Sequence, residues 1–550
     1  MNFARLSGFG RSDRARQSRG PQLVLMALFL SAYGSFAQAQ AVLKSYQPDS
    51  GEAPWSVLAT APYVTDPGFN SGLYYADAFA GNPFEVRLGR RIVHLANGDV
   101  IAAGVVPATT GANRAPINLG LVRYNSAGQR VAWSNPGLYG FFADSYVIFP
   151  NSGVAGNSSN VKDVLDLKVV GNRVFVMTDH RFNGGDDIDS IIHVFGTDGS
   201  YIRSTKVFGT VQPEYSGGMV VYSSLTLPET VTVLVTGTTF NGVWRPTFRR
   251  GTLNGDSSIA LDAVVFPNPG NSCPSNRGCI LRTIAVGGSF VFGPPTRFYL
   301  GGTRQFSSND WDFLVMAVNS DGSPLTAFSG DGVINVPFDD GGDSYDDVRS
   351  ISVQPGTGFL NTRDRIYASG FVDRTCKDGF GVVKLTEAGD LDTTFGSSGK
   401  LVVGGANPGP GGLCPILGSS SAAYANDMTL ASGKLAVAGF TARRPMILCI
   451  VGEPCPEDIV DGMVAVIDTE QGDVESFRTY PYSDLVNGAR SRHSGFFGIV
   501  ASGNGTFTAT GDVRYFQIAA GQPSGGQQFG TLRVRSDRIF AGNFGIGGDP

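Results

Sequence analysis

The stretch GDLDTTFGSSGK, Gly389–Lys400, decides the fold of this chain because a second copy of its pattern stands upstream. The segment GSPLTAFSGDGV, Gly322–Val333, aligns with it at an offset of 67 residues, and a short apolar run precedes each copy. The aligned pairs are Gly322 with Gly389, Thr326 with Thr393, Phe328 with Phe395 and Gly332 with Gly399. A pattern that returns at a fixed period indicates a repeat architecture, so we interpret the stretch as the turn between two strands of one repeat.

A short apolar strand that ends at a glycine recurs along the rest of the chain. The positions that end it are Gly104, Thr178, Gly237, Gly302, Gly370, Gly439 and Gly511. The 407 residues from the first to the last make six steps of about 68 residues. Each unit contains four short, β-branched segments separated by Gly, Asp, Asn and Ser turns, and sustained helical periodicity is absent.

Seven four-stranded units predict an all-β fold, a single β-propeller of seven blades. A β-solenoid, whose rungs are usually shorter, or separate β-sandwiches are the alternatives. The last unit lacks a fourth strand, so we expect an N-terminal strand, Phe84–Leu88, to complete it and close the ring. The expected organisation is a signal peptide at 1–39, an N-terminal extension at 40–82, the propeller at 83–540 and a C-terminal tail at 541–550.

The N-terminus resembles an export signal. Five arginines precede an apolar run, Leu23–Ala37, and Ala37-Gln38-Ala39 has the small-residue pattern of a cleavage site. The run is too short to span a bilayer well, although an uncleaved membrane anchor is the alternative. We therefore expect a periplasmic, cell-surface or extracellular protein with no later membrane-spanning segment.

Composition restricts the class of partner. The chain has 75 glycines among 550 residues, 11% aromatic and 16% charged residues, which is typical of a turn-rich β protein. Removal of residues 1–39 takes away five arginines and one aspartate and moves the net charge from −5 to −9. An acidic surface without a basic cluster argues against nucleic-acid binding.

The six cysteines fit an oxidising compartment. Cys273 and Cys279 lie six residues apart, as do Cys449 and Cys455, which predicts two local disulfides. Cys376 and Cys414 remain for a longer bridge. Metal binding would need closer Cys-x-x-Cys pairs or nearby histidines.

With these residues in view, the repeat resembles the delta-60 repeat family of bacterial β-propellers. The family pattern, Leu-Asp-x-x-Phe-Gly-x-x-Gly after a glycine turn, is matched at Gly389, Leu391, Asp392, Phe395, Gly396 and Gly399. The fourth unit matches it in part, through Phe328 and Gly332, and the other units have lost it. The resemblance implies a secreted or surface propeller without established catalytic residues. The last residues, SDRIFAGNFG, also resemble a short tail of exported proteins.

Within the repeat, we interpret these residues as structural. Phe395 and Phe328 are expected to be buried pegs between blades, and Asp392 is expected to bond backbone amides of the turn. The glycines are expected where the turn needs a positive φ or a close backbone approach.

Few residues indicate chemistry. Acidic loops are the best metal candidates, because calcium prefers six to eight oxygen ligands, and a solvated turn is the alternative. The first loop contains Asp339, Asp340, Asp343, Asp346 and Asp347, and the second contains Asp186, Asp187 and Asp189. Asp310, Asp312, Asp378 and Asp461 are expected just before third strands, where they would line one propeller face or simply fix the turns.

The four histidines, His94, His180, His193 and His493, lack the spacing of metal ligands, and we expect surface or packed side chains. Catalytic motifs of hydrolases, zinc peptidases and phosphate loops are absent. We expect no catalytic residues and no cofactor, with Ca²⁺ as the one cofactor left open. The sequence therefore favours a non-catalytic binding or surface-interaction protein, whose ligand is an extracellular glycan or protein. The alternative is a hydrolase or lyase that acts on an extracellular polymer at the central face.

Overall fold

The computed structural model describes the strands and most turns of the compact unit formed by residues 43–550. The described ranges are 45–46, 63–66, 68–69, 75–77, 88–107, 116–136, 140–141, 146–149, 159–182, 188–208, 214–224, 230–268, 273, 276–288, 294–338, 345–356, 363–374, 377–406, 422–443, 459–480, 490–502, 505–519 and 522–536. Every regular element in these ranges is a β-strand, and none of them contains a helix that could cross a membrane.

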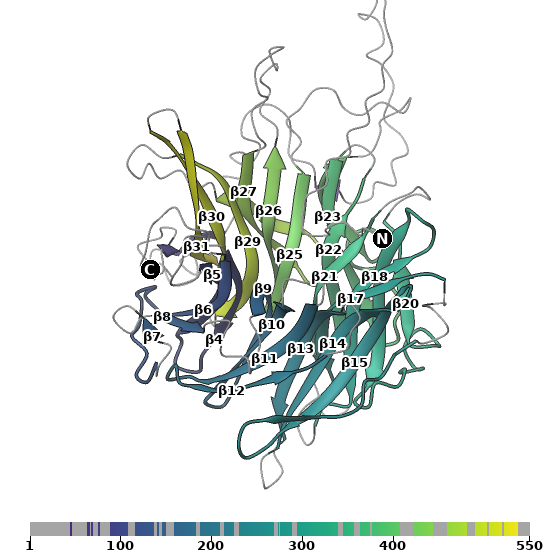
Figure 1. Ribbon diagram of the computed structural model, residues 1–550. Coiled ribbons are helices and arrows are strands. Elements are labelled where there is room, and N and C mark those ends of the chain that lie inside the picture. The colour runs from purple at the N-terminus through teal and green to yellow at the C-terminus, as the bar shows by residue number, and fades with distance from the viewer. Residues whose placement is uncertain are drawn as a thin grey trace, which may run out of the picture. The chain divides into compact units, whose positions relative to one another are not determined.

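The described strands form a seven-bladed β-propeller, and each blade is an antiparallel sheet of four strands in chain order (Figure 1). Blade 1 has β4 (Leu88–His94), β5 (Val100–Pro107), β6 (Pro116–Tyr124) and β8 (Tyr146–Phe149), with β7 (Gly140–Phe141) outside β8. Blade 2 has β9 (Ser159–Val170), β10 (Arg173–Phe182), β11 (Ile188–Gly196) and β12 (Tyr201–Lys206). Blade 3 has β13 (Glu214–Ser223), β14 (Val231–Phe240), β15 (Trp244–Leu253) and β16 (Ile259–Leu261).

The second half of the ring repeats this arrangement. Blade 4 has β17 (Cys279–Gly287), β18 (Arg297–Gln305), β19 (Trp311–Asn319) and β20 (Val333–Val336). Blade 5 has β21 (Asp347–Gln354), β22 (Arg365–Val372), β23 (Lys377–Thr386) and β24 (Lys400–Ala406), with β1 (Ser45–Tyr46) parallel to β24. Blade 6 has β25 (Ala422–Ala431), β26 (Lys434–Arg443), β27 (Ile459–Asp468) and β28 (Val474–Tyr480). Blade 7 has β29 (Arg490–Ser502), β30 (Thr506–Ala519) and β31 (Gln522–Ser536).

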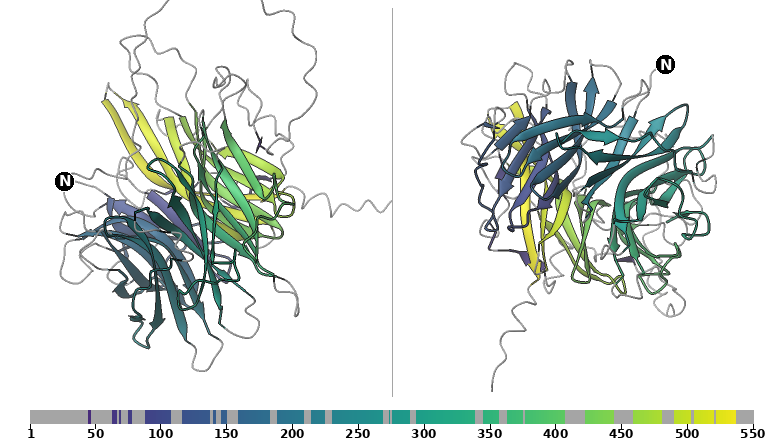
Figure 2. Two further views of the ribbon diagram at one scale, coloured as in Figure 1. Left: turned by 90° about the vertical axis from the view of Figure 1, so that its right-hand side faces the viewer. Right: turned by 90° about the horizontal axis from the view of Figure 1, so that it is seen from below.

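The ring closes through the N-terminal part of the chain, but not through the predicted strand. β2 (Tyr63–Thr65) and β3 (Tyr75–Asp77) pair antiparallel with β31 and supply the outer edge of blade 7. The prediction that Phe84–Leu88 does this was wrong, because Leu88 begins β4 and pairs with Val105 inside blade 1. Residues before position 83 therefore contribute strands to the propeller. Figure 2 shows the yellow blade 7 beside the blue blade 1.

The first strand of each blade contacts the first strand of the next, and β29 contacts β4, so these seven strands surround the axis. Apolar side chains pack between neighbouring blades in seven clusters, one at each blade interface, rather than in a single central core. Third strands such as β11 and β19 are consequently buried on both faces, whereas the outer strand β12 is half-buried to exposed. This explains why the third strands have continuous apolar runs instead of alternation.

An aromatic residue joins each of several blades to a glycine of the next. The fully buried ring of Phe395 in blade 5 lies against Gly472 of blade 6, and Phe328 of blade 4 lies against Gly389 of blade 5. Both glycines have positive φ angles, 72° and 87°, and a Cβ there would meet the ring at 3.1 Å. Trp133 with Gly199 and Phe248 with Gly322 make equivalent contacts. We call these four contacts the peg joints.

The turn that leads to Phe395 is held by Asp392. Its Oδ1 accepts hydrogen bonds from the backbone amide of Thr394 at 3.1 Å and from the Thr394 hydroxyl at 2.6 Å. Its Oδ2 lies 3.0 Å from the Nζ of Lys384, which is buried between the blades. Gly396 and Gly399 have φ angles of 56° and 89°, which a side chain would strain.

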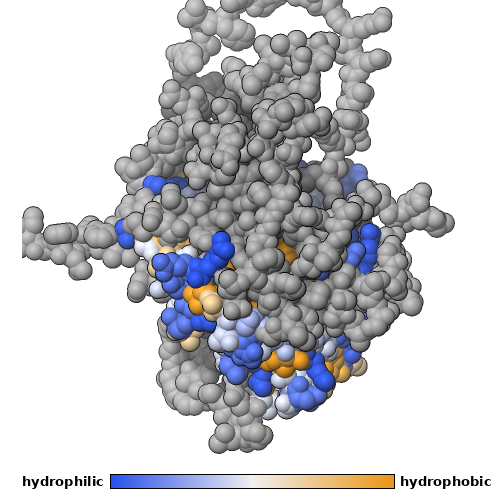
Figure 3. Space-filling model, turned by 60° about the vertical axis from the view of Figure 1, so that its left-hand side comes forward, coloured by the Kyte–Doolittle hydropathy of each residue, from blue (hydrophilic) through white to orange (hydrophobic). Residues whose placement is uncertain are grey.

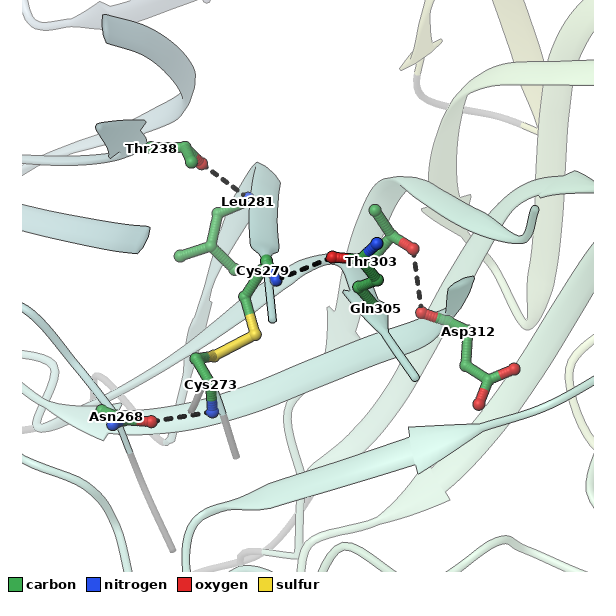
Figure 4. Close-up of a disulfide and its surroundings, with 9 residues drawn as sticks. Thr238, Asn268, Cys273, Cys279, Leu281, Thr303, Gln305 and Asp312 are labelled. Carbon is green, nitrogen blue, oxygen red and sulfur yellow. Dashed lines mark hydrogen bonds between the residues drawn. A yellow bond between two sulfur atoms is a disulfide. The ribbon is translucent and has the colours of Figure 1, made fainter. Parts of the chain in front are cut away.

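One predicted disulfide is confirmed, between Cys273 and Cys279 (Figure 4). Both half-cystines are buried in the cluster between blades 3 and 4, and the backbone amide of Leu281 donates to Thr238 Oγ1 of blade 3 at 2.9 Å. The disulfide therefore fastens the entry of β17 to the preceding blade. The other four cysteines, Cys376, Cys414, Cys449 and Cys455, lie outside the described residues.

Candidate binding face around the propeller axis

Each of the seven first strands contains a β-bulge at one equivalent position. In blade 5, Val348 pairs with Gly370 and Ser350 with Ser369, so Arg349 between them has no cross-strand partner. The unpaired residues, from blade 1 to blade 7, are Arg90, Leu165, Gly217, Arg282, Arg349, Asn426 and Phe497. We call these the bulge residues. A bulge re-aims side chains at a strand edge, and here it repeats around the axis.

The bulges explain the recurring glycine of the second strands. The residue before each bulge pairs with the strand-ending position of the repeat, which is Gly302, Gly370, Gly439 or Gly511 in blades 4 to 7. A Cβ at these four glycines would lie 1.7–1.9 Å from a backbone carbonyl oxygen of the bulged strand. Only glycine permits so close an approach of two backbones.

Residues next to the bulges link consecutive blades. Asp427 Oδ2 accepts the backbone amide of Ile499 in blade 7 at 3.0 Å, and Asp166 Oδ2 accepts the amide of Met219 in blade 3 at 2.8 Å. Arg91 donates to the carbonyl of Leu165 in blade 2 at 2.6 Å and to that of Phe497 in blade 7. These bonds fix the backbone around the axis, and one bulge side chain takes part in the same task, because Asn426 Nδ2 donates to the Phe496 carbonyl of blade 7 at 2.8 Å.

Three bulge residues are arginines. Arg90 Nε lies 2.8 Å from Asp163 Oδ1 of blade 2. In the equivalent contact one half-turn away, Arg282 Nε lies 3.4 Å from Asp347 Oδ2 of blade 5. Arg349 Nη2 reaches the same Asp347 oxygen at 3.0 Å. Burial alone would lower the pKa of Arg282, but the Asp347 charge raises that pKa above its usual value.

A line of aromatic rings crosses from blade 4 to blade 7 at the level of these arginines. Phe371 and Phe440 pair across their blades with Asp347 and Tyr424, which stand two residues before the bulges. Adjacent ring centroids lie 4.7–6.5 Å apart, and every ring is half-buried. This aromatic belt consists of Trp311, Tyr345, Phe371, Tyr424, Phe440 and Phe497. Arg90 continues it, with its guanidinium 4.3 Å from the Phe497 ring centroid.

A pair of carboxyl groups borders the belt. The hydroxyl of Tyr424 donates to Asp378 Oδ2 at 2.7 Å. Burial, together with the neighbouring charge of Asp378, raises the pKa of Asp373 to about 6. A carboxyl group with a raised pKa beside a second carboxyl group is suited to proton transfer, and among the described residues this is the feature of the face with catalytic character.

The structure brings two of the predicted histidines together, although not as a surface site. His180 on β10 and His193 on β11 are fully buried, with their Nε2 atoms 3.2 Å apart and each within 3.0 Å of the Thr178 hydroxyl. Burial lowers the pKa of His180 to about 4, and burial lowers that of His193 as well. His94 lies 2.5 Å from the Ser502 hydroxyl, and the side chain of His493 lies outside the described residues.

The acidic-loop candidates are only partly described. Asp346 accepts backbone amides of Phe338 and Asp373, both at 3.1 Å, and Asp347 is paired with arginines, so both carboxylates serve the fold. In the second loop, Asp189 pairs with Lys206. In the part of the chain that the structure describes, no group of three or more acidic, His or Cys side chains forms a metal site. Asp339, Asp340, Asp343, Asp186 and Asp187 lie outside it.

The four aspartates predicted to precede the third strands lie partly within them. Asp312, Asp378 and Asp461 lie inside β19, β23 and β27, and Asp310 precedes β19. Asp312 and Asp461 are buried, and Asp378 accepts a hydrogen bond from Tyr424 of the aromatic belt. Sequence reasoning missed the bulge arginines altogether. Their signal is the repeat itself, because Arg282 and Arg349 are 67 residues apart, the same offset as Phe328 and Phe395.

Comparisons with known proteins give only weak structural similarities, and the fold assignment rests on the strand topology of this chain itself. The sequence matches no protein-family model and no curated protein. Among solved structures, it is similar to the polysaccharide lyase Uly1, at 10% identity and a TM-score of 0.41, over 84% of this chain and 91% of that one. It is also similar to an apocarotenoid oxygenase variant from Synechocystis, at 10% identity and a TM-score of 0.34, over 86% and 92%. Similarities at this level carry no inference about ligand or activity.

Proposed function

We propose that this chain is an exported β-propeller of the delta-60 repeat type that binds an extended extracellular ligand, a glycan or a protein, without chemical turnover. Three features of the sequence support export: the basic leader, the apolar run Leu23–Ala37 and the cysteine content. The proposed binding surface is the aromatic belt together with the bulge residues.

The aromatic belt is the observation that carries the proposal. Its six rings come from four consecutive blades, and each keeps part of its surface exposed. Rigid, amphipathic aromatic side chains provide large contact area at low entropic cost, which is why they concentrate at binding sites. By contrast, the described part of the outer surface in Figure 3 has only small apolar patches among hydrophilic residues. Phe266, on the outside of blade 3, is an isolated ring with 56% of its surface exposed.

Alanine substitution in the belt tests the proposal. A screen of extracellular glycans and peptides identifies a ligand for the native protein, and Tyr424→Ala and Phe440→Ala are then compared with Phe266→Ala as the matched control. We expect the two belt variants to lose binding and the control to retain it. Circular dichroism and thermal melts establish that each variant is folded. Equal binding by all three variants would place the ligand site elsewhere.

One observation favours a catalytic alternative, an extracellular polymer-degrading enzyme. Burial and the neighbouring charge of Asp378 raise the pKa of Asp373 to about 6, as expected for a general acid or base. If the native protein cleaves a polymer, and if Asp373→Asn abolishes cleavage while binding remains, the enzyme is the correct assignment. The binding proposal predicts no cleavage product in the same assay.

A further inference from the structure

The arginines of blades 4 and 5 form a cationic cluster with fewer anionic partners than charges. Arg282 and Arg349 approach the same carboxylate oxygen, Asp347 Oδ2, at 3.4 and 3.0 Å. Tyr345 adds a neutral hydroxyl, 3.5 Å from that oxygen. Two guanidinium groups therefore share one ion-paired carboxylate. Asp179 also interacts electrostatically with Arg282, but burial raises the pKa of Asp179 to about 7, so below that pH it is mostly neutral and the described residues leave an excess of positive charge.

The neighbouring acidic groups are engaged elsewhere in the fold. Both carboxylate oxygens of Asp346 accept backbone amides, and Asp378 accepts the Tyr424 hydroxyl. In blade 2, Asp163 is paired with Arg90 of blade 1. Asp347 is thus the one carboxylate among the described residues with an ion pair to either arginine.

Arg349 keeps most of its hydrogen-bonding capacity. A guanidinium group has five N–H donors in a planar fork, and the Asp347 contact uses one of its nitrogens. Its side chain is 40% exposed, more than that of Arg282 at 31% or Arg90 at 16%. It stands at a bulge of β21, so the backbone around it is held by the pairing on either side. A planar carboxylate or a sulfate group can accept two hydrogen bonds from such a fork.

The belt determines what kind of anion fits. Phe371 pairs across β21 and β22 with Asp347, and Tyr424 stacks on Phe371 with their ring centroids 5.3 Å apart. Exposed ring surface beside a charged fork suits a ligand with both apolar C–H faces and regularly spaced anionic groups. Sugar rings that carry carboxylate or sulfate groups have this combination.

From this juxtaposition we infer that the belt and the Arg282–Arg349 pair bind an anionic glycan, with Arg349 as the anion-contacting residue. The inference rests on the proposed function of this face. It assigns the ligand class and identifies Arg349 as a determinant of specificity. Asp347 is a positioning residue, because it holds both guanidinium groups at the axis without facing the ligand itself.

The test compares ligands that differ only in charge. Binding of oligogalacturonate and of its methyl ester is measured by calorimetry, with dextran sulfate and dextran as the sulfate pair. The proteins are the native chain, Arg349→Ala and Arg349→Lys, with Arg203→Ala as control. Arg203 lies on the outer strand β12, is 47% exposed and pairs with Asp256, so it matches Arg349 in charge and exposure but lies away from the axis.

We expect the native protein to bind at least one acidic glycan about ten- to a hundredfold more tightly than its uncharged counterpart. Arg349→Ala should remove that difference by weakening binding of the acidic glycan toward that of its uncharged counterpart. Arg349→Lys should restore only part of it, since an ammonium group lacks the bidentate geometry. Arg203→Ala should behave as the native protein does.

Three results would overturn the inference. Equal affinity for charged and uncharged partners would refute the anionic ligand but leave glycan binding by the belt in place. An acidic preference that survives in Arg349→Ala would move the anion site elsewhere. No binding to any of the four glycans would also refute it, and the belt variants with their own screened ligand would then decide separately whether the proposed function stands.

Discussion

The peg joints and the bulge residues both recur in several blades. The side chain is always aromatic at the peg joints, whereas it varies in type at the bulges. At the joints the residue type persists: Trp133, Phe248, Phe328 and Phe395 each fill the same space against a positive-φ glycine. At the bulges the backbone geometry persists, while the side chain is Arg, Leu, Gly, Asn or Phe. A joint must fill a fixed volume in each of these four blades, so an aromatic residue is kept there by packing. A bulge is defined by its backbone geometry, so its side chain can differ from blade to blade and, at Arg349, is available to a ligand.

The largest effect is expected at a peg joint. Phe395→Ala should lower the free energy of unfolding by about 3–5 kcal/mol, because it empties a fully buried site between blades 5 and 6. Urea unfolding followed by fluorescence measures the change. Ligand binding by the folded fraction should persist, since the ring does not belong to the belt. A decrease in the free energy of unfolding of less than about 1 kcal/mol would contradict the interpretation of Phe395 as a buried contact that stabilises blades 5 and 6.

A smaller decrease in the free energy of unfolding is expected where the Asp427 side chain forms hydrogen bonds with the first strands of neighbouring blades. Asp427→Ala removes the acceptor of the Ile499 amide and of the Ser350 hydroxyl, and it should cost about 1–3 kcal/mol. Asp256→Ala is the control, because Asp256 is an exposed partner of Arg203. Equal unfolding midpoints for the two variants would show that these inter-strand bonds do not hold the ring.

The pH dependence of stability tests a buried carboxyl in blade 2. Burial, with a further contribution from Asp163, raises the pKa of Asp179 from 3.8 to about 7. Between these values the folded state binds more protons than the unfolded state, so stability contributed by protonated Asp179 is full below pH 4 and is lost as the pH rises to 7. The slope is at most about 1.4 kcal/mol per pH unit.

In Asp179→Asn the hydrogen bond from the Ser190 hydroxyl can remain, and the titration disappears. The difference in unfolding free energy between the native protein and this variant should therefore change between pH 4.5 and 7 and be constant above pH 7.5. Urea midpoints at five pH values measure it. Parallel curves for the two proteins would show that Asp179 is ionised throughout.

The smallest effect on stability is expected at the axis. Arg349→Ala should change the free energy of unfolding by less than about 1 kcal/mol, because a 40% exposed arginine in an ion pair contributes little. The same substitution should have the largest effect on the preference for acidic glycans. A stability loss as large as that of Phe395→Ala would mean that the bulge arginines are structural, and the contrast between joints and bulges would fail.

Much of the fold was predictable because packing repeats. The fully buried third strands appear in the sequence as apolar runs, and the close approach at Gly302, Gly370, Gly439 and Gly511 appears as a periodic glycine. The closing strand was not predictable in this way. PFEVRLGR resembles an edge strand by composition, but Leu88 pairs inside blade 1, and the short β2 and β3 close the ring instead. Which N-terminal segment reaches the last blade depends on contacts across more than 400 residues of chain.

By itself, the sequence determined the period, the four-stranded unit, the blade count and the local disulfide between Cys273 and Cys279. These features depend on contacts within one repeat or between neighbouring repeats, so they can be recognised from patterns in the amino-acid sequence. Only the tertiary structure decided that Arg282 and Arg349 share Asp347 and that six aromatic rings from four blades form one belt. Such a face arises where different blades meet around the axis, and there each repeat contributes a different side chain at an equivalent backbone position.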